Sequence, residues 1–196
     1  AFKKQHEKVN ILLREASPNT LEKMLKGGQI DLAVMPLPIK DSSICYKPFL
    51  INKMVLAMGK NDPLNMYSYA KRLSSGRRYF DLKNADGATF ILGEVGQRIR
   101  VASDHIISKS GISIKTAFSS VNIETIKRLV GAGLGITLLP ELYLYTNSER
   151  LGGDINCYCL EPEQDYPWTI VSAYYKTNSL TMAAKCFMEI LGEMQG

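Results

Sequence analysis

Polar side chains that could bind a small molecule gather in one glycine-rich stretch, Leu92-Gly-Glu-Val-Gly-Gln97. An apolar strand pattern runs into this stretch and a helical pattern leaves it. In open α/β sheets, ligands bind beyond the carboxyl ends of parallel strands, near helix N-termini. Gly93 and Gly96 would let backbone N–H groups approach a ligand closely. Gln97 can donate and accept hydrogen bonds, and Glu94 would favour a ligand with a cation or several donors.

Two further strand ends carry candidate ligand contacts, which are mostly apolar: Pro36, Leu37, Val121 and Asn122. The first pair follows a strand pattern at residues 30–35, and the second follows one at residues 113–118. These side chains fit a small aromatic or mixed-polarity metabolite as well as an anion. Each candidate also has a purely structural interpretation: turns for the glycines, solvent exposure for Glu94, and the end of a strand for Pro36.

The sequence lacks the spacings of residues that are typical of catalytic sites and of metal sites. The sequence contains no serine-nucleophile elbow, no HExxH and no P-loop. His6 and His105 have no catalytic partner nearby in sequence. Cys157 and Cys159 share one face of a predicted strand, but their spacing does not match a zinc knuckle. We therefore expect no catalytic residues, no metal ion and no cofactor, and free thiols in a reducing cytoplasm.

The overall composition is that of a soluble globular protein with one domain or two small lobes. The chain has 196 residues, of which 45% are hydrophobic and 22% charged. No apolar run approaches the roughly 20 residues of a membrane span. The net charge of +5 is modest, and much of the excess lies in a basic segment, residues 71–78. Such a segment is more typical of a solvated loop than of nucleic-acid binding.

The elements that position these candidates are organised around residues 123–141. The first half is an amphipathic helix that Ser120 or Asn122 can cap. Three glycines then predict a tight reversal into a short buried strand, residues 136–139, with Pro140 opening another helix. A dinucleotide fingerprint needs glycines between a strand and the helix that follows. Here they follow a helix and precede a strand, so the pattern indicates close packing instead.

Strand and helix patterns alternate along the remaining chain, which predicts an α/β protein. Strands are expected at residues 9–15, 30–35, 44–50, 53–58, 88–92, 113–118, 155–160 and 168–175. Helices are expected from Ser17 to about residue 26, at 96–109, near 141–145 and at 180–194. The strand, helix and strand within residues 9–35 predict a parallel βαβ unit. A polar connection at residues 67–78 has room for a helical turn.

The order of these motifs resembles the effector-binding domain of LysR-type transcriptional regulators. The matching pieces are Leu25-Lys-Gly-Gly-Gln-Ile-Asp-Leu-Ala-Val34, Lys47-Pro-Phe-Leu50, Met54-Val-Leu-Ala57, Asp62-Pro-Leu64, Asp81-Leu82, Leu129-Val-Gly-Ala-Gly-Leu-Gly-Ile-Thr-Leu-Leu-Pro140 and Lys185-Cys-Phe187. Two departures stand out. The family's opening strand and the start of its first helix, which normally supply hydroxyl groups to the ligand site, are absent before Phe2. The connection at residues 67–78 is also longer than usual.

The resemblance implies a two-lobed, periplasmic-binding-protein-like (type II) α/β fold with mixed sheets, flanking helices and a ligand cleft between the lobes. Lobe I is then residues 1–51 plus 162–196, and lobe II is residues 52–161. The family's ligand contacts match Pro36, Gly96 and Val121 or their neighbours.

The implied function is ligand sensing and dimerisation in a bacterial transcriptional regulator, where a small-molecule effector controls DNA binding and transcription. The resemblance implies a cytoplasmic homodimer or tetramer, without a membrane partner. Its copies would pair head to tail through the strand at 9–15 and the helix at 123–132. DNA would be bound only through a winged helix-turn-helix that this chain lacks. A solute-binding protein without a regulatory role is the alternative, and an enzyme is a third, less favoured reading.

Overall fold

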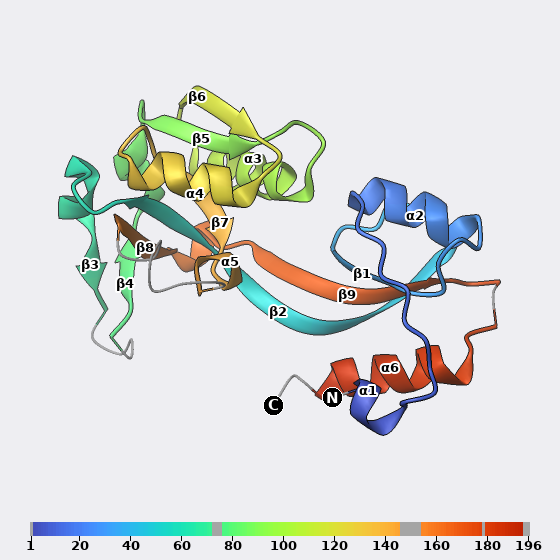
Figure 1. The fold of residues 1–196 in the computed structure, drawn as a ribbon. Coiled ribbons are helices and arrows are strands. Elements are labelled where there is room, and N and C mark those ends of the chain that lie inside the picture. The colour runs from blue at the N-terminus through green and yellow to red at the C-terminus, as the bar shows by residue number, and fades with distance from the viewer. Residues whose placement is uncertain (1, 72–75, 146–153, 178, 194–196) are drawn as a thin grey trace. The chain divides into compact units, whose positions relative to one another are not determined.

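The computed structural model describes four stretches of the chain: residues 2–71, 76–145, 154–177 and 179–193. The chain divides into two compact units (Figure 1). Unit 1 comprises residues 1–51 and 169–196, and unit 2 comprises residues 52–168. The chain passes between them inside two long strands, β2 (Ile44–Gly59) and β9 (Pro167–Tyr175). Unit 2 is therefore an insertion between the two segments that build unit 1.

The described part of unit 1 contains parts of β2 and β9 together with four further elements: α1 (Phe2–Gln5), α2 (Pro18–Lys26), β1 (Ala33–Pro36) and α6 (Met182–Glu193). Helix α2 begins where the sequence predicts, because the Ser17 hydroxyl accepts a hydrogen bond from the N–H of Thr20 and Pro18 occupies the first turn. It ends at Gly27, whose N–H donates to the carbonyl of Lys23 over 2.9 Å.

The core of unit 1 joins residues from both ends of the chain. Leu21 and Leu25 on the buried face of α2 belong to one cluster with residues of β1, β2 and β9: Ala33, Met35, Ile44, Val171 and Ala173. Strand β1 pairs antiparallel with β9, with Ala33 opposite Ala173. Phe2 of α1 packs edge-on against Phe187 of α6, with ring centroids 5.2 Å apart.

The predicted strand at residues 9–15 is wrong, and so is the parallel βαβ unit built on it. These residues have no regular secondary structure, and Leu12 and Leu13 are each 77% exposed. A strand forms only where a neighbouring backbone supplies hydrogen-bond partners, and within the described residues none pairs with this segment. Asp31, expected inside a strand, lies exposed before β1.

Unit 2 is built on the second half of β2 and six further strands among its described residues: β3 (Tyr69–Ala70), β4 (Arg78–Phe80), β5 (Thr89–Gly93), β6 (Lys115–Ser120), β7 (Thr137–Pro140) and β8 (Ile155–Leu160). Strand β2 pairs antiparallel with β7 and with β8, and β8 pairs parallel with β4. The sequence predicts two separate extended pieces at β2. They form one continuous strand, whose residues 54–58 are fully buried.

Helices flank these strands: α3 (Arg98–Ser110), α4 (Ile123–Gly131) and α5 (Leu142–Tyr145), with 3₁₀ turns η1 (Pro63–Tyr67), η2 (Leu82–Ala85) and η4 (Pro162–Gln164). Helix α3 packs on β5 and β7, and α4 packs on β5 and β6 (Figure 1). Within the described residues, no helix has both the length and the apolar character that crossing a bilayer demands.

The central stretch forms the predicted helix, glycine turn and buried strand. Asn122 caps α4 by accepting hydrogen bonds from the N–H groups of Glu124 and Thr125. Gly135 has φ +153°, and a Cβ placed there would lie 2.8 Å from the Thr89 carbonyl oxygen. Strand β7 follows and is buried throughout. Pro140 ends β7 rather than opening a helix, because residue 140 still pairs with Met54 of β2.

Residues 162–168 belong to unit 2 by their contacts. The side-chain carbonyl of Gln164 accepts a hydrogen bond from the N–H of Leu82 at 3.0 Å, and its amide donates to Asp81 at 2.7 Å. The ring of Tyr166 lies 5.2 Å from that of His105 on α3. The boundary between the units in β9 therefore follows Trp168.

Candidate functional site

Most of the predicted contact residues lie at one edge of unit 2, where two parallel strands end together. Strands β5 and β6 pair in parallel, with Gly93 opposite Ser120. The chain leaves β5 through residues 94–97 into α3, and leaves β6 through Val121 and Asn122 into α4. Two helix N-termini therefore begin at this edge, and at α4 the Asn122 side chain already accepts hydrogen bonds from the N–H groups of Glu124 and Thr125.

Gln97 ties the two loops of this edge together. Its Oε1 accepts a hydrogen bond from the N–H of Glu94 at 2.9 Å, and its Nε2 donates to the carbonyl of Val121 at 3.1 Å. Its own N–H donates to the carbonyl of Glu94 at 3.1 Å. The sequence suggests this amide as a donor and acceptor for a ligand. Both of its polar atoms already hold the loops, so Gln97 fixes the shape of the edge.

The two glycines of the stretch are required for different reasons. A Cβ on Gly93 would lie 2.6 Å from Cγ2 of Ile99 and 3.0 Å from Oε1 of Gln97, so Gly93 permits close packing of the loop on α3. Gly96 has φ +93°, with open space where a Cβ would stand. Its backbone conformation therefore favours glycine there. Leu92 is 1% exposed and can offer a ligand little beyond its backbone.

The exposed groups at this edge are one carboxylate and two apolar side chains. Glu94 is exposed, and within the described residues its carboxylate has neither an ion-pair nor a hydrogen-bond partner. Val95 is 81% and Val121 70% exposed. The side-chain oxygen of Asn122 is occupied by the α4 cap. The edge therefore combines backbone N–H groups, one negative charge and a small apolar surface.

Pro36 and Leu37, the remaining predicted contacts, lie in unit 1. Pro36 is the last residue of β1 and pairs with Ile170 of β9. The N–H of Leu37 donates to the carbonyl of Thr169 at 2.9 Å, and its half-buried side chain packs against the core of unit 1. That these two residues and the unit 2 edge contact one ligand stays a prediction.

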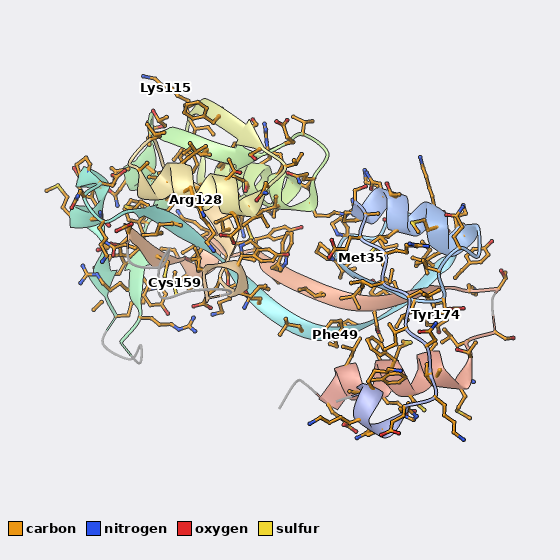
Figure 2. The ribbon with its side chains drawn as sticks, viewed as in Figure 1. Met35, Phe49, Lys115, Arg128, Cys159 and Tyr174 are labelled. Carbon is orange, nitrogen blue, oxygen red and sulfur yellow. The ribbon has the colours of Figure 1, made fainter. Side chains whose placement is uncertain are left out.

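Metal-ligand chemistry finds no support in the described part of the chain, where no three His, Cys, Asp or Glu side chains cluster. Cys157 and Cys159 alternate with the buried Tyr158 on β8, as expected for one strand face, and both are free thiols. Nη1 of Arg77 lies 3.8 Å from the sulfur of Cys159, which Figure 2 labels. The ring of His105 contacts that of Tyr166 at a tilt of 58°.

Unit 2 also contains an open pocket that its sequence does not predict. It has a volume of about 470 Å³ and lies between η1, β4 and β8, lined by Asn65, Ser68, Arg78 and Asn156 among others. The sequence places Arg78 in a basic segment with the character of a solvated loop. The one local signal is the Asp62-Pro-Leu-Asn65 turn, because Asn65 in such a turn can bond to nearby backbone.

Comparison with known proteins gives a family and a fold. A family model described as LysR substrate binding domain matches residues 1–196. The chain is 28% identical over 200 residues to YcgK of Bacillus subtilis (strain 168), described as an uncharacterized HTH-type transcriptional regulator. That alignment covers 98% of this chain and 60% of YcgK. This chain is also 31% identical over 142 residues to the transcriptional dual regulator GltC of the same organism. That second alignment covers 72% of this chain and 44% of GltC.

Among solved structures, the CcmR regulatory domain of Synechocystis PCC6803 in complex with 2-PG aligns with a TM-score of 0.82 at 16% sequence identity. That alignment covers 99% of this chain and 87% of the CcmR chain. The match confirms the predicted fold class, the periplasmic-binding-protein-like (type II) α/β fold of effector-binding domains. This chain spans less than two thirds of the length of either curated relative.

Proposed function

Because this chain belongs to the LysR substrate-binding domain family, we propose that it is the ligand-sensing and dimerisation domain of a transcriptional regulator. A small-molecule effector binds it in the cytoplasm and changes how the regulator binds DNA. DNA contact is made by a winged helix-turn-helix outside these 196 residues. The observation that carries the ligand-sensing role is the edge of β5 and β6, which Gln97 holds in one shape.

The proposed effector is a small metabolite of mixed polarity. Its polar part approaches the loop 94–97 and the N-terminus of α4, and its apolar part covers Val95 and Val121. Since Glu94 is exposed and unpaired within the described residues, a donor or cationic group on the ligand gains a charge-assisted hydrogen bond there. The CcmR regulatory domain was solved with 2-PG. An anionic group of a ligand would have to avoid Glu94 in this chain and accept hydrogen bonds from the backbone N–H groups.

The proposed dimer covers apolar surface that the monomer leaves exposed. Ile11, Leu12 and Leu13 are 47%, 77% and 77% exposed in unit 1. In unit 2, every residue of β6 is exposed except the half-buried Ser120, and Phe118 is 47% exposed. A head-to-tail pair, in which each copy offers residues 11–13 to β6 and α4 of the other, satisfies twofold symmetry. We expect such an interface to bury more than about 1,000 Å².

Thermal-shift screening against a metabolite panel tests the ligand site. The double variant Gly96→Trp with Gln97→Ala should lose the stabilisation that an identified effector gives the native protein, because the indole fills the edge and the loop tie is gone. Gly111→Trp is the matched control. Gly111 also has positive φ and open space at its Cβ, but it ends α3 at the helix's other terminus. An effector that stabilises the double variant as much as the control places the site elsewhere.

A further inference from the structure

The open pocket beside η1, β4 and β8 has walls that are held in place by one hydrogen-bond network. Asn65 is its hub: Nδ2 lies within hydrogen-bond distance of the carbonyls of Gly59, Lys60 and Asp62. Its Oδ1 accepts from Nδ2 of Asn156 at 3.0 Å and from the hydroxyl of Tyr158 at 2.5 Å. The η1 turn and strand β8 are thus fixed to each other, so the pocket is preorganised.

Arg78 enters this network through Ser68. Its Nε donates to Oγ of Ser68 at 3.1 Å, and its Nη2 donates to the carbonyl and to Oγ of the same residue, each at 2.7 Å. The buried Ser68 in turn donates from Oγ to the carbonyl of Asn65 at 2.7 Å. Nη1 of Arg78 has no hydrogen-bond partner within the described residues. The guanidinium is therefore held in a fixed orientation with one edge still able to donate.

The charge of Arg78 also differs from that of its neighbours in having no carboxylate partner among the described residues. Lys71 forms an ion pair with Glu161 at 2.6 Å, and Arg77 forms one with Glu141 at 3.3 Å. Within the described residues, Arg78 is bonded only to the neutral Ser68. None of the described residues that line the pocket is acidic. Within the described residues, the pocket therefore presents a positive charge that no lining carboxylate compensates.

We propose that this pocket is a second ligand site, separate from the edge of β5 and β6, and that it binds a small organic anion. The volume of about 470 Å³ suits a metabolite. The carboxylate or phosphate accepts hydrogen bonds from the free edge of Arg78, because a guanidinium matches both groups geometrically. Hydroxyl or carbonyl groups of the same ligand bond to Asn156, and Ile155 supplies an apolar wall. The pocket lies wholly within unit 2.

Amide and side-chain NMR of the purified protein tests this inference with two probes, inorganic phosphate and L-malate, at constant ionic strength. We expect saturable shifts of the Asn156 side-chain amide and the Arg78 Nε–H with each probe, at millimolar concentration. Saturation by only one probe supports the site and assigns it to phosphates or to carboxylates. Shifts that rise linearly without saturating, or shifts confined to the Gln97 amide, overturn it.

The Kd values of variants distinguish binding at this pocket from non-specific attraction between charges. Arg78→Gln should raise the apparent Kd at least about tenfold, because the charge-assisted hydrogen bonds are lost. Arg128→Gln is the matched control: it removes the same charge from an exposed position on α4 (Figure 2) and should change Kd less than about twofold. Arg78→Lys keeps the charge without the fork and should give an intermediate Kd, which decides the matter if Arg78→Gln does not fold. Equal Kd values in all variants contradict the proposal.

Discussion

Gln97 donates a hydrogen bond from Nε2 to the backbone carbonyl of Val121, 3.1 Å away and 24 positions later in the chain. The same amide accepts from the N–H of Glu94. One side chain therefore determines how the loop after β5 lies against the loop after β6. Any ligand that contacts both loops depends on this amide without having to touch it.

Substitutions of Gln97 should distinguish the contribution of its hydrogen bond with Glu94 from that of its hydrogen bond with Val121. Gln97→Ala removes both side-chain bonds and should lower the free energy of unfolding by about 1–2 kcal/mol, since each such bond contributes roughly 0.5–1.5 kcal/mol. Gln97→Glu can still accept from Glu94 but cannot donate to Val121, and it sets two carboxylates close together. Urea unfolding of the three proteins measures the effect. An alanine variant as stable as the native protein would show that solvent replaces both bonds at no cost.

In the glycine turn before β7, substitution should destabilise the protein more at Gly135 than at Gly133. Gly135→Ala places a methyl group 2.8 Å from the Thr89 carbonyl in a strained conformation, and should destabilise the protein by roughly 1–3 kcal/mol. Gly133 has φ +76° but open space at its Cβ, so Gly133→Ala should cost about 1 kcal/mol. Denaturant midpoints give both values. Equal midpoints for the two variants would contradict the steric argument.

The ion pair of Asp41 should make part of the stability of unit 1 depend on pH. Hydrogen bonds from Lys26 and Ser43 hold the pKa of the Asp41 carboxyl well below its usual range. A lowered folded-state pKa stabilises the fold above the unfolded value of about 4, and this stabilisation is lost as pH falls towards the folded value. The melting temperatures of native protein and Asp41→Asn should therefore differ at pH 7, and the difference should shrink progressively as the pH falls below about 4 towards the folded value. Asp31→Asn, at an exposed position without a partner within the described residues, controls for the loss of a charge.

A charge in the exposed segment of unit 1 should weaken the proposed dimer. Leu12→Asp puts a carboxylate where the interface would exclude water, so sedimentation equilibrium at micromolar concentration should shift towards monomer. Met66→Asp is the matched control, because Met66 in unit 2 is also 77% exposed and lies in η1, outside the proposed interface. Unchanged association in the Leu12 variant would remove residues 11–13 from the interface.

Helices were predictable from the sequence because their signals are local. Ser17, Pro18 and Gly27 delimit α2, and Asn122 caps α4, all within a few residues of the elements they terminate. Strands depend on partners that are distant in sequence. The apolar alternation at residues 9–15 therefore could not reveal that no described backbone pairs with it.

The sequence correctly predicted that these candidate residues follow strands ending at one edge, while their binding of a ligand stays a prediction. The strand-end rule located Gly93, Gln97 and Val121, since β5 and β6 do end together. It could not show that the Gln97 amide is already engaged, because its partner is 24 positions away. The Arg78 pocket was missed for the same reason, since Asn156 lies 78 positions beyond Arg78 in the sequence.

The insertion of unit 2 within unit 1 has a consequence for how the protein is made. Leu21 and Leu25 need Val171 and Ala173 to complete their core, and those two residues are translated after the whole of unit 2. All of residues 52–168 have been translated by then, and domains generally fold as units during synthesis. The inserted unit is therefore fully synthesised before Leu21 and Leu25 gain their partners Val171 and Ala173.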